Sequence, residues 1–197
     1  ITVRLVGSEM CIRDRSISGG SATLGSTNPT AITKDTPTFS AATIDNNLSG
    51  AQGLQLADLD FDGDVDIIAC GKSGNDLNWY ESDGSGSYTE RSIDLNLSGA
   101  QGLAINDIDG DGDLDIFATA RDGNQVALYT NNGSQSFTKT VIDSDLSQPH
   151  HVECTDLNDD GYMDLIATGR VSDEIIWYSN DGSQNFTENV LRNDLNG

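Results

Sequence analysis

The sequence is short of positive charge. Its 197 residues include only 10 lysines and arginines against 32 aspartates and glutamates, which gives a net charge of −22. A surface of that sign repels phosphate backbones and anionic lipid headgroups, because both are bound through lysine and arginine. No hydrophobic run approaches the roughly 20 residues that a membrane-spanning helix needs. We therefore predict a protein that binds no nucleic acid and does not insert into a membrane.

Cysteine and histidine are scarce as well, with three and two residues respectively. Cys70 and Cys154 fall in apolar segments, so we expect two unpaired, buried, small side chains rather than a disulfide. The two histidines, His150 and His151, are adjacent. The sequence contains no G-x-S-x-G nucleophile motif, no phosphate-binding loop and no H-E-x-x-H. These absences favour a protein that is not an enzyme.

The segment "RLVGSEMCIRDR", residues 4–15, is typical of the translated read-through of a transposase-type sequencing adapter. We interpret residues 1–15 as such an artefact and exclude them from fold reasoning. On this interpretation Cys11 is not biological and the natural N-terminus is missing. A short apolar and basic leader is the alternative.

Acidic loops of similar sequence recur along the chain. "DLDFDGDVD" begins at Asp58, "DIDGDGDLD" at Asp107 and "DLNDDGYMD" at Asp156, so successive loops start 49 residues apart. A fixed period of about 20 to 50 residues indicates a repeat architecture. Short apolar segments separated by glycine, asparagine and aspartate surround each loop, which favours short strands with tight turns.

Each repeat holds four candidate strands. In the first repeat they are residues 54–57, 65–69, 77–80 and a segment that starts at Tyr88. The second is a nearly continuous apolar run, which predicts a strand buried on both faces. Asp83-Gly84, with equivalent dipeptides in the other repeats, predicts a tight hairpin between the third and fourth strands.

Four antiparallel strands in 49 residues match the size of one β-propeller blade. We predict an all-β fold, a β-propeller fragment with three full four-stranded blades and part of a preceding blade. Because propellers close with about four to eight blades, we expect the sequence to be a truncated piece of a longer one. A β-sandwich is the alternative, but it does not account for the constant period. The predicted boundaries are 16–50 for a degraded or partial preceding blade and 51–99, 100–148 and 149–197 for the full blades.

The alternating carboxylates of each loop repel one another unless a cation lies between them. Calcium is a hard cation that takes about six to eight oxygen ligands. We expect ligands from the side chains at positions 1, 3, 5 and 9 and from the main-chain oxygen at position 7, with glycine at position 6 supplying the turn. This predicts one Ca²⁺ per blade and three in the chain. The predicted ligands are Asp58, Asp60, Asp62, Asp64 and Asp66; Asp107, Asp109, Asp111, Asp113 and Asp115; and Asp156, Asn158, Asp160, Tyr162 and Asp164.

Two departures in the third loop bear on this prediction. Asn158 keeps an oxygen but loses a charge, so we expect weaker calcium binding there. Tyr162 stands where only the main-chain oxygen is needed. An EF-hand is excluded, because the twelfth position is an alanine inside a predicted strand rather than glutamate. Magnesium prefers fewer carboxylates and retained water, so the loops favour calcium over magnesium. Solvated acidic turns without a metal are the remaining alternative.

The loop pattern, followed by a strand and "WYESDGSGSYT" or "LYTNNGSQSFT", resembles FG-GAP/VCBS-type repeats over roughly residues 39–197. It is also similar to the calcium-bearing blades of integrin α-subunit propellers. The resemblance implies a propeller, usually of about seven blades, on secreted or cell-surface proteins. It further implies calcium between the first two strands of a blade, and roles in adhesion, in carbohydrate or protein binding, or as accessory domains of exported enzymes.

We therefore predict a non-catalytic, calcium-binding propeller module of an extracellular or cell-surface protein, which binds a protein or glycan partner and packs against further blades. A carbohydrate-binding propeller and an accessory domain of a secreted polysaccharide-degrading enzyme are the alternatives. Trp79 and Trp177 could stack on sugars, but Leu128 at the same repeat position favours packing between blades. His150 or His151 could face a ligand in the central channel. Neighbouring residues of a strand point to opposite sides, which argues against joint chelation of one ion.

Overall fold

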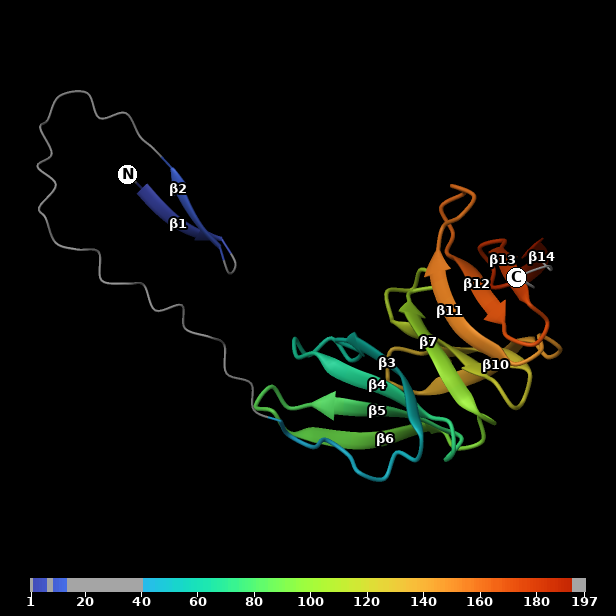
Figure 1. Ribbon diagram of the computed structural model, residues 1–197, viewed down its shortest axis with the longest axis horizontal. Helices are drawn as coiled ribbons and strands as arrows, with labels where there is room; N and C mark the ends of the chain where they lie inside the picture. The colour runs from blue at the N-terminus through green and yellow to red at the C-terminus, as the bar shows by residue number, and fades with distance from the viewer. Residues whose placement is uncertain (1, 7–8, 14–40, 193–197) are drawn as a thin grey trace, which may run out of the picture. The chain divides into compact units, whose positions relative to one another are not determined.

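The structure is a computed structural model that describes residues 2–6, 9–13 and 41–192 (Figure 1). The chain divides into two units, Ile1–Ala41 and Ala42–Gly197. In the first unit, β1 (Thr2–Val6) pairs with β2 (Glu9–Arg13) in an antiparallel hairpin. This pairing does not bear on the predicted adapter origin of residues 1–15. Of the predicted partial blade at 16–50, residues 16–40 lie outside the described part of the chain.

The second unit consists of three antiparallel sheets of four strands each, with the strands of every sheet in chain order. This confirms the predicted all-β fold and its three four-stranded repeats, which we call blades 1, 2 and 3. Blade 1 contains β3 (Ala51–Ala57), β4 (Asp66–Gly71), β5 (Asp76–Ser82) and β6 (Tyr88–Asp94). Blade 2 contains β7 (Ala100–Asn106), β8 (Asp115–Ala120), β9 (Gln125–Asn131) and β10 (Phe137–Asp143). Blade 3 contains β11 (Pro149–Thr155), β12 (Asp164–Gly169), β13 (Glu174–Asn180) and β14 (Phe186–Arg192).

The hydrophobic core lies between the blades. One cluster joins Ile68 and Trp79 of blade 1 to Leu103, Ile116 and Tyr129 of blade 2. The packing role predicted for Trp79 is therefore confirmed, since only 3% of its surface is exposed. A second cluster joins blades 2 and 3, through Phe117, Leu128, Val152, Leu165 and Tyr178 among others. Each seam between neighbouring blades thus has its own core.

The second strand of each blade is largely buried, as its apolar run predicts, and β8 is buried along its whole length. The first strands differ among the blades. Leu54 in β3 is 59% exposed, whereas Leu103 at the same position of β7 is 4% exposed. Strand β7 lies between β3 and β11 (Figure 1) and also contacts β4. The exposure of these leucines therefore follows the place of the blade in the array and not the residue type.

The first strands approach one another closely, and two glycines allow this. A Cβ atom at Gly53 would lie 2.4 Å from the carbonyl oxygen of Gln101, and one at Gly102 would lie 2.8 Å from that of His150. Both contacts are shorter than a real side chain tolerates, so a larger residue would push the neighbouring blade away. His151 occupies the equivalent position in β11.

The first strand of each blade also carries a β-bulge. The register between the first and second strands shifts between Ala51 and Leu54, between Ala100 and Leu103, and between Pro149 and His151. A bulge interrupts the alternation of side chains between the two faces of a sheet. The argument that His150 and His151 must point to opposite sides therefore does not hold here, and both line one cavity.

The connection between the third and fourth strands is longer than a two-residue hairpin. In blade 1 it spans residues 83–87, and the Asp83 amide donates to the Ser87 carbonyl oxygen at 3.1 Å. The Asp83 carboxylate also accepts from the amides of Ser85 and Ser87. Positive φ angles occur at Gly84 and Gly86 and not at Asp83. The side chain of the aspartate closes this turn, which a two-residue hairpin would not require.

Cys70 and Cys154 are both free, in agreement with the prediction, and Cys70 is buried while Cys154 is half-buried. No helix long and apolar enough to cross a membrane occurs within the described residues.

Candidate functional site

The acidic loops join the first and second strands of each blade, and a shared set of hydrogen bonds gives them one shape. In blade 1 the Asp58 carboxylate accepts from the amide of Gly63, five residues later, at 3.0 Å. Asp107 and Asp156 make the equivalent bonds to Gly112 and Gly161. The three glycines have φ angles of 98°, 96° and 92°. Glycine adopts such angles without steric cost, which explains its presence at position 6 of every loop.

The aspartate at position 9 anchors each loop to the sheet. Asp115 is completely buried, and its two carboxylate oxygens accept from the amides of Ile108 at 3.0 Å and Asn131 at 2.8 Å. Asn131 belongs to β9, so one side chain joins the loop to the third strand of the blade. Asp66 and Asp164 are equally buried and accept the same two bonds in their own blades.

Three predicted ligands come together in each of the first two loops. Oxygen atoms of the carboxylates at positions 1, 3 and 9 lie within 4.8 Å of one another in both loops. In the third loop the middle carboxylate is replaced by the amide of Asn158, which leaves two acidic groups at these positions. The two acidic triads are Asp58, Asp60 and Asp66 in blade 1 and Asp107, Asp109 and Asp115 in blade 2.

The position-5 aspartates have a different arrangement from the triads. Asp62 and Asp111 are exposed, and each accepts from the amide of the position-7 residue at 2.9 Å. Asp160 makes the same bond to the amide of Tyr162. The geometry therefore separates a partly buried triad at positions 1, 3 and 9 from a turn-forming aspartate at position 5.

The electrostatics of the triads disfavour negative charge in the absence of a cation. Burial raises the pKa of Asp60 and of Asp109, and neighbouring carboxylates add to the effect. Burial also raises the pKa of Asp115 to about 6, although this group accepts two main-chain hydrogen bonds. Arg91, Arg121 and Lys139 pair with carboxylates outside the loops. A bound cation would stabilise the charges that these sites bring together.

One atom provides a direct test of whether a cation fits. The Oδ1 oxygen of Asp58 is buried and has no hydrogen-bond donor among the described residues. A buried carboxylate oxygen without a partner carries a large desolvation cost. A hard cation such as Ca²⁺ is bound by oxygen ligands of this kind. The residues at positions 1, 3 and 9 therefore fit a calcium ion, with side-chain or main-chain oxygens of positions 5 and 7 available to complete its shell.

Sequence reasoning missed the special backbone at position 4 of the loop. Phe61 and Asp159 have φ angles of 58° and 60°, a region that bulky residues seldom occupy. Gly110 stands at this position in the second loop, with a φ angle of 77°. Gly110 was the only residue whose type indicated a positive φ angle at this position. The first and third loops have Phe61 and Asp159 there, which do not indicate it.

A second missed feature is a repeated bond between successive repeats. The hydroxyl of Tyr129 in β9 donates to the carboxylate of Asp94, at the end of β6, at 2.7 Å. Tyr178 donates to Asp143 in the same way, and Tyr80 donates to Asp45. In each case the tyrosine follows its aspartate by 35 residues. This constant separation was visible in the sequence, but no local motif marks it.

The histidines belong to a polar row that crosses the first strands of the three blades. The Nε2 atoms of Gln101 and His150 lie 2.8 Å apart, and Gln101 also approaches the side chain of Gln52 at 3.5 Å. His151 pairs with Glu153 at 3.2 Å. The row borders a cavity of about 270 Å³. His150, His151 and Glu153 do not form a cluster of the kind found in the acidic loops.

Comparison with known proteins gives a family and a fold. The family described as FG-GAP-like repeat matches twice, at residues 58–118 and 107–167, which together cover more than half of the chain. No curated protein matches. The solved structure of selenomethionine-substituted virginiamycin B lyase from Staphylococcus aureus is similar, with 19% identity and a TM-score of 0.50. The similarity covers 76% of this chain and 44% of the lyase, so this chain spans less than half of that structure.

Proposed function

Because the chain belongs to the FG-GAP-like repeat family, we propose that it is a non-catalytic interaction module whose propeller blades bind calcium. The observation that carries the proposal is the triad of Asp58, Asp60 and Asp66, whose carboxylates each place an oxygen within 4.8 Å of the others. The Oδ1 oxygen of Asp58 is also buried without a partner. The equivalent triad in blade 2 supports the same conclusion. Each ion would be held between the first two strands of its blade.

The proposed role of calcium is structural. The carboxylates lie on loops that join two strands, and position 9 also anchors the loop to the sheet. Calcium would offset the repulsion among them, and stability would increase with RT ln(1 + [Ca²⁺]/Kd) for each site. Calcium sites of extracellular modules commonly have Kd values of about 10⁻⁴–10⁻³ M. Sites of that strength would be filled outside cells and mostly empty inside them, as suits the exported or cell-surface protein that we propose.

The proposed partner is a protein or a glycan that meets an acidic surface, as in adhesion. The lyase in the comparison is an enzyme by its name, and its similarity to this chain concerns the fold alone. The described blades bring together two acidic triads suited to a metal, and we assign no catalytic role to them.

Calorimetric titration of the whole chain with calcium, with thermal unfolding at both ends of the titration, tests the proposal. We expect two stronger sites, one weaker site and a higher Tm with calcium. The double variant Asp60→Asn, Asp109→Asn should weaken the two stronger sites. Asp173→Asn, which removes a charge outside the loops, should not. A Tm and a heat signal that calcium and EGTA leave unchanged would refute the calcium role.

A further inference from the structure

The acidic loop of blade 2 faces blade 3 across a cavity of about 220 Å³. Asp107 and Asp109, two members of the blade 2 triad, line this cavity. Tyr162 and Gly182 of blade 3 line it as well. The Tyr162 ring packs against Gly182, where an added Cβ atom would lie 2.5 Å from two ring carbons. The triad of blade 2 therefore borders a space that the neighbouring blade closes.

One residue of blade 3 reaches across the seam to a predicted calcium ligand of blade 2. Gln184 lies in the turn between β13 and β14, and its Nε2 atom donates to the Oδ2 oxygen of Asp109 at 3.0 Å. Its Oε1 oxygen accepts from the hydroxyl of Thr130, in β9, at 3.4 Å. Both ends of the amide are thus held by blade 2. We call the chain of Thr130, Gln184 and Asp109 the glutamine bridge.

The glutamine bridge gives the Asp109 carboxylate its second hydrogen bond. The Oδ1 oxygen accepts from the amide of Asp111 at 3.2 Å, and the Oδ2 oxygen accepts from Gln184. Asp109 is exposed, and the last torsion of an aspartate side chain is loosely restrained when nothing holds it. Each carboxylate oxygen has two lone pairs, so one on each oxygen stays available to a cation. A neutral amide also orients the carboxylate without cancelling its charge, as a lysine would.

The backbone at Gln184 is unfavourable for a glutamine. Its φ angle is 59°, and the equivalent residue of blade 1 is a glycine, Gly86, with a φ angle of 93°. Residues with a Cβ atom seldom adopt such angles, whereas glycine does so readily. A strained residue that the fold retains points to a role for its side chain.

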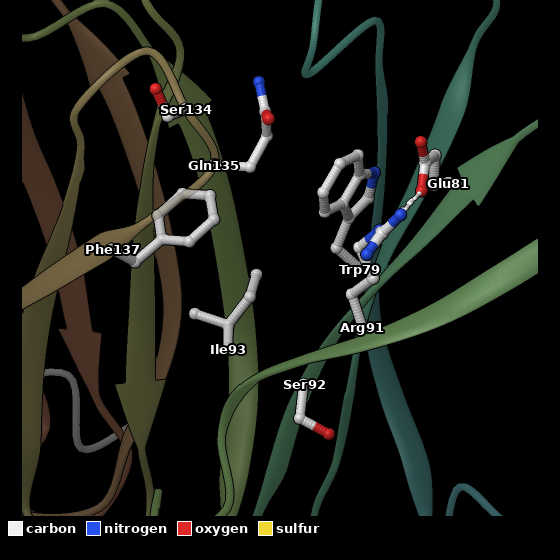
Figure 2. Close-up of a pocket in the computed structure, with 8 residues that line it drawn as sticks. All are labelled: Trp79, Glu81, Arg91, Ser92, Ile93, Ser134, Gln135 and Phe137. Carbon is white, nitrogen blue, oxygen red and sulfur yellow. Dashed lines mark hydrogen bonds and ion pairs between the residues drawn. The ribbon is translucent and has the colours of Figure 1, made fainter.

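The seam between blades 1 and 2 provides an internal comparison. Gln135 stands there at the same turn position, with a φ angle of 54°. Glu81 stands at the position of Thr130, and its carboxylate pairs with Arg91. Figure 2 shows this pair on one side of the Trp79 ring and Gln135 on the other. An ionised carboxylate has no hydrogen to donate to an amide oxygen, so one end of the bridge is missing.

The other end of the bridge is missing in this seam as well. Within the part of the chain that the structure describes, Gln135 makes no hydrogen bond to Asp60, the equivalent of Asp109. The Asp60 carboxylate accepts from the amide of Asp62 at 3.3 Å. The two triads therefore differ in how their position-3 carboxylate is held, although their ligand residues are the same.

We propose that Gln184 is a positioning residue for the calcium site of blade 2, so that the neighbouring blade completes this site. The bridge limits the orientations of the Asp109 carboxylate before an ion binds, which lowers the entropy that binding costs. Hydrogen-bond partners of metal ligands typically contribute about 10- to 100-fold in metal affinity. By linkage, calcium in blade 2 strengthens the contact with blade 3 in return. This inference rests on the proposed calcium role and adds a dependence of one blade on the next.

The test is a calorimetric calcium titration of the whole chain in two backgrounds, each of which keeps one acidic triad. With Asp60→Asn, the strongest remaining site is that of blade 2, and Gln184→Gly should weaken it about tenfold. With Asp109→Asn, the strongest remaining site is that of blade 1. There Gln135→Gly, the same substitution at the same turn position, should leave the affinity unchanged.

Thermal unfolding in EGTA separates positioning from a merely structural role. Gln184→Gly installs the residue that blade 1 has at this position, so its Tm without calcium should match that of Gln135→Gly. A merely structural glutamine would lower this Tm and leave calcium affinity unchanged. Thr130→Val removes the hydroxyl that holds the other end of the amide, and it should weaken the blade 2 site by a smaller factor than Gln184→Gly.

The possible failures can be told apart. A chain without substitutions that binds no calcium would refute the calcium role and this inference with it. Calcium binding in blade 2 that Gln184→Gly leaves unchanged would overturn this inference alone. Equal losses of affinity for Gln184→Gly and Gln135→Gly would also overturn it, because only the first variant removes a bridge.

Discussion

Blades 2 and 3 have the same loop framework but differ in the charges placed on it. Asp115 and Asp164 are both fully buried and accept equivalent main-chain hydrogen bonds. Of these two blades, blade 2 alone brings three carboxylates together in its loop, because Asn158 replaces the carboxylate of Asp109 in blade 3.

This difference separates two tasks of the acidic loop. Position 9 and the glycine at position 6 determine the shape of the loop, and they are the same in both blades. The side chain at position 3 contributes charge for a cation, and it varies without altering that shape. Loop conformation and calcium affinity should therefore respond to different substitutions.

The largest effect is expected from removing the anchor at position 9. Asp115→Ala and Asp164→Ala should each lower the free energy of unfolding by about 2 kcal/mol in EGTA. Two amides lose their acceptors, at about 1–3 kcal/mol for each buried one, and relief of the buried charge offsets part of this cost. At a calcium concentration ten times the Kd, loss of the blade 2 site should add about 1.4 kcal/mol. Urea unfolding in EGTA measures the loss of the anchor, and urea unfolding with calcium measures the added loss of the site. Equal losses for the two variants under both conditions would contradict the comparison.

The tyrosine bonds between blades should also differ in strength. Asp94 accepts from Lys139 at 2.8 Å as well as from Tyr129, whereas Glu188 stands at the position of Lys139 in blade 3. Burial raises the pKa of Glu188, and the Asp143 carboxylate adds to this effect.

We therefore expect Tyr129→Phe to cost about 1 kcal/mol and Tyr178→Phe about 2 kcal/mol, since Asp143 then faces Glu188 without the hydroxyl. Urea unfolding measures both values, and Tyr88→Phe, outside these bonds, serves as the control. A larger loss for Tyr129→Phe would reverse the expected order.

Calcium affinity should follow the residue at position 3. Asn158→Asp should strengthen calcium binding in blade 3 about tenfold, and Asp109→Asn should weaken it in blade 2 by a similar factor, because ligand charge tunes the affinity of such sites. Calorimetry resolves the change in each blade, and circular dichroism should show the same fold for both variants. Unchanged affinities would mean that position 3 does not contact the ion.

The smallest expected effect is a dependence on pH in blade 2. Since burial raises the pKa of Asp115 to about 6, protons compete with calcium there. Affinity should be roughly fourfold weaker at pH 5.5 than at pH 7. Without calcium, the free energy of unfolding should change with pH in the opposite direction to calcium affinity. A carboxyl whose folded-state pKa is raised costs stability as the pH increases from about 4 to about 6. Calorimetry and urea unfolding across this range measure both trends, and parallel trends would contradict the assignment.

Several features could be predicted from the sequence because they repeat locally. The 49-residue spacing of the acidic loops indicates a repeat. The apolar runs predict the buried second strands, and the glycine at position 6 predicts the turn of each loop. The bulge beside His150 could not be predicted, because it depends on the register between β11 and β12. The positive φ angle at Phe61 was likewise hidden, since glycine occupies that position only in blade 2.

The sequence by itself determined the repeat unit, the strand pattern and the residue types that suit a hard cation, since each of these depends on neighbouring residues or on a constant period. Only the tertiary structure decided which leucines are buried and which carboxylates meet. Those properties depend on contacts between residues that are distant in the chain. Blades with the same strand pattern therefore acquire different surfaces from their neighbours.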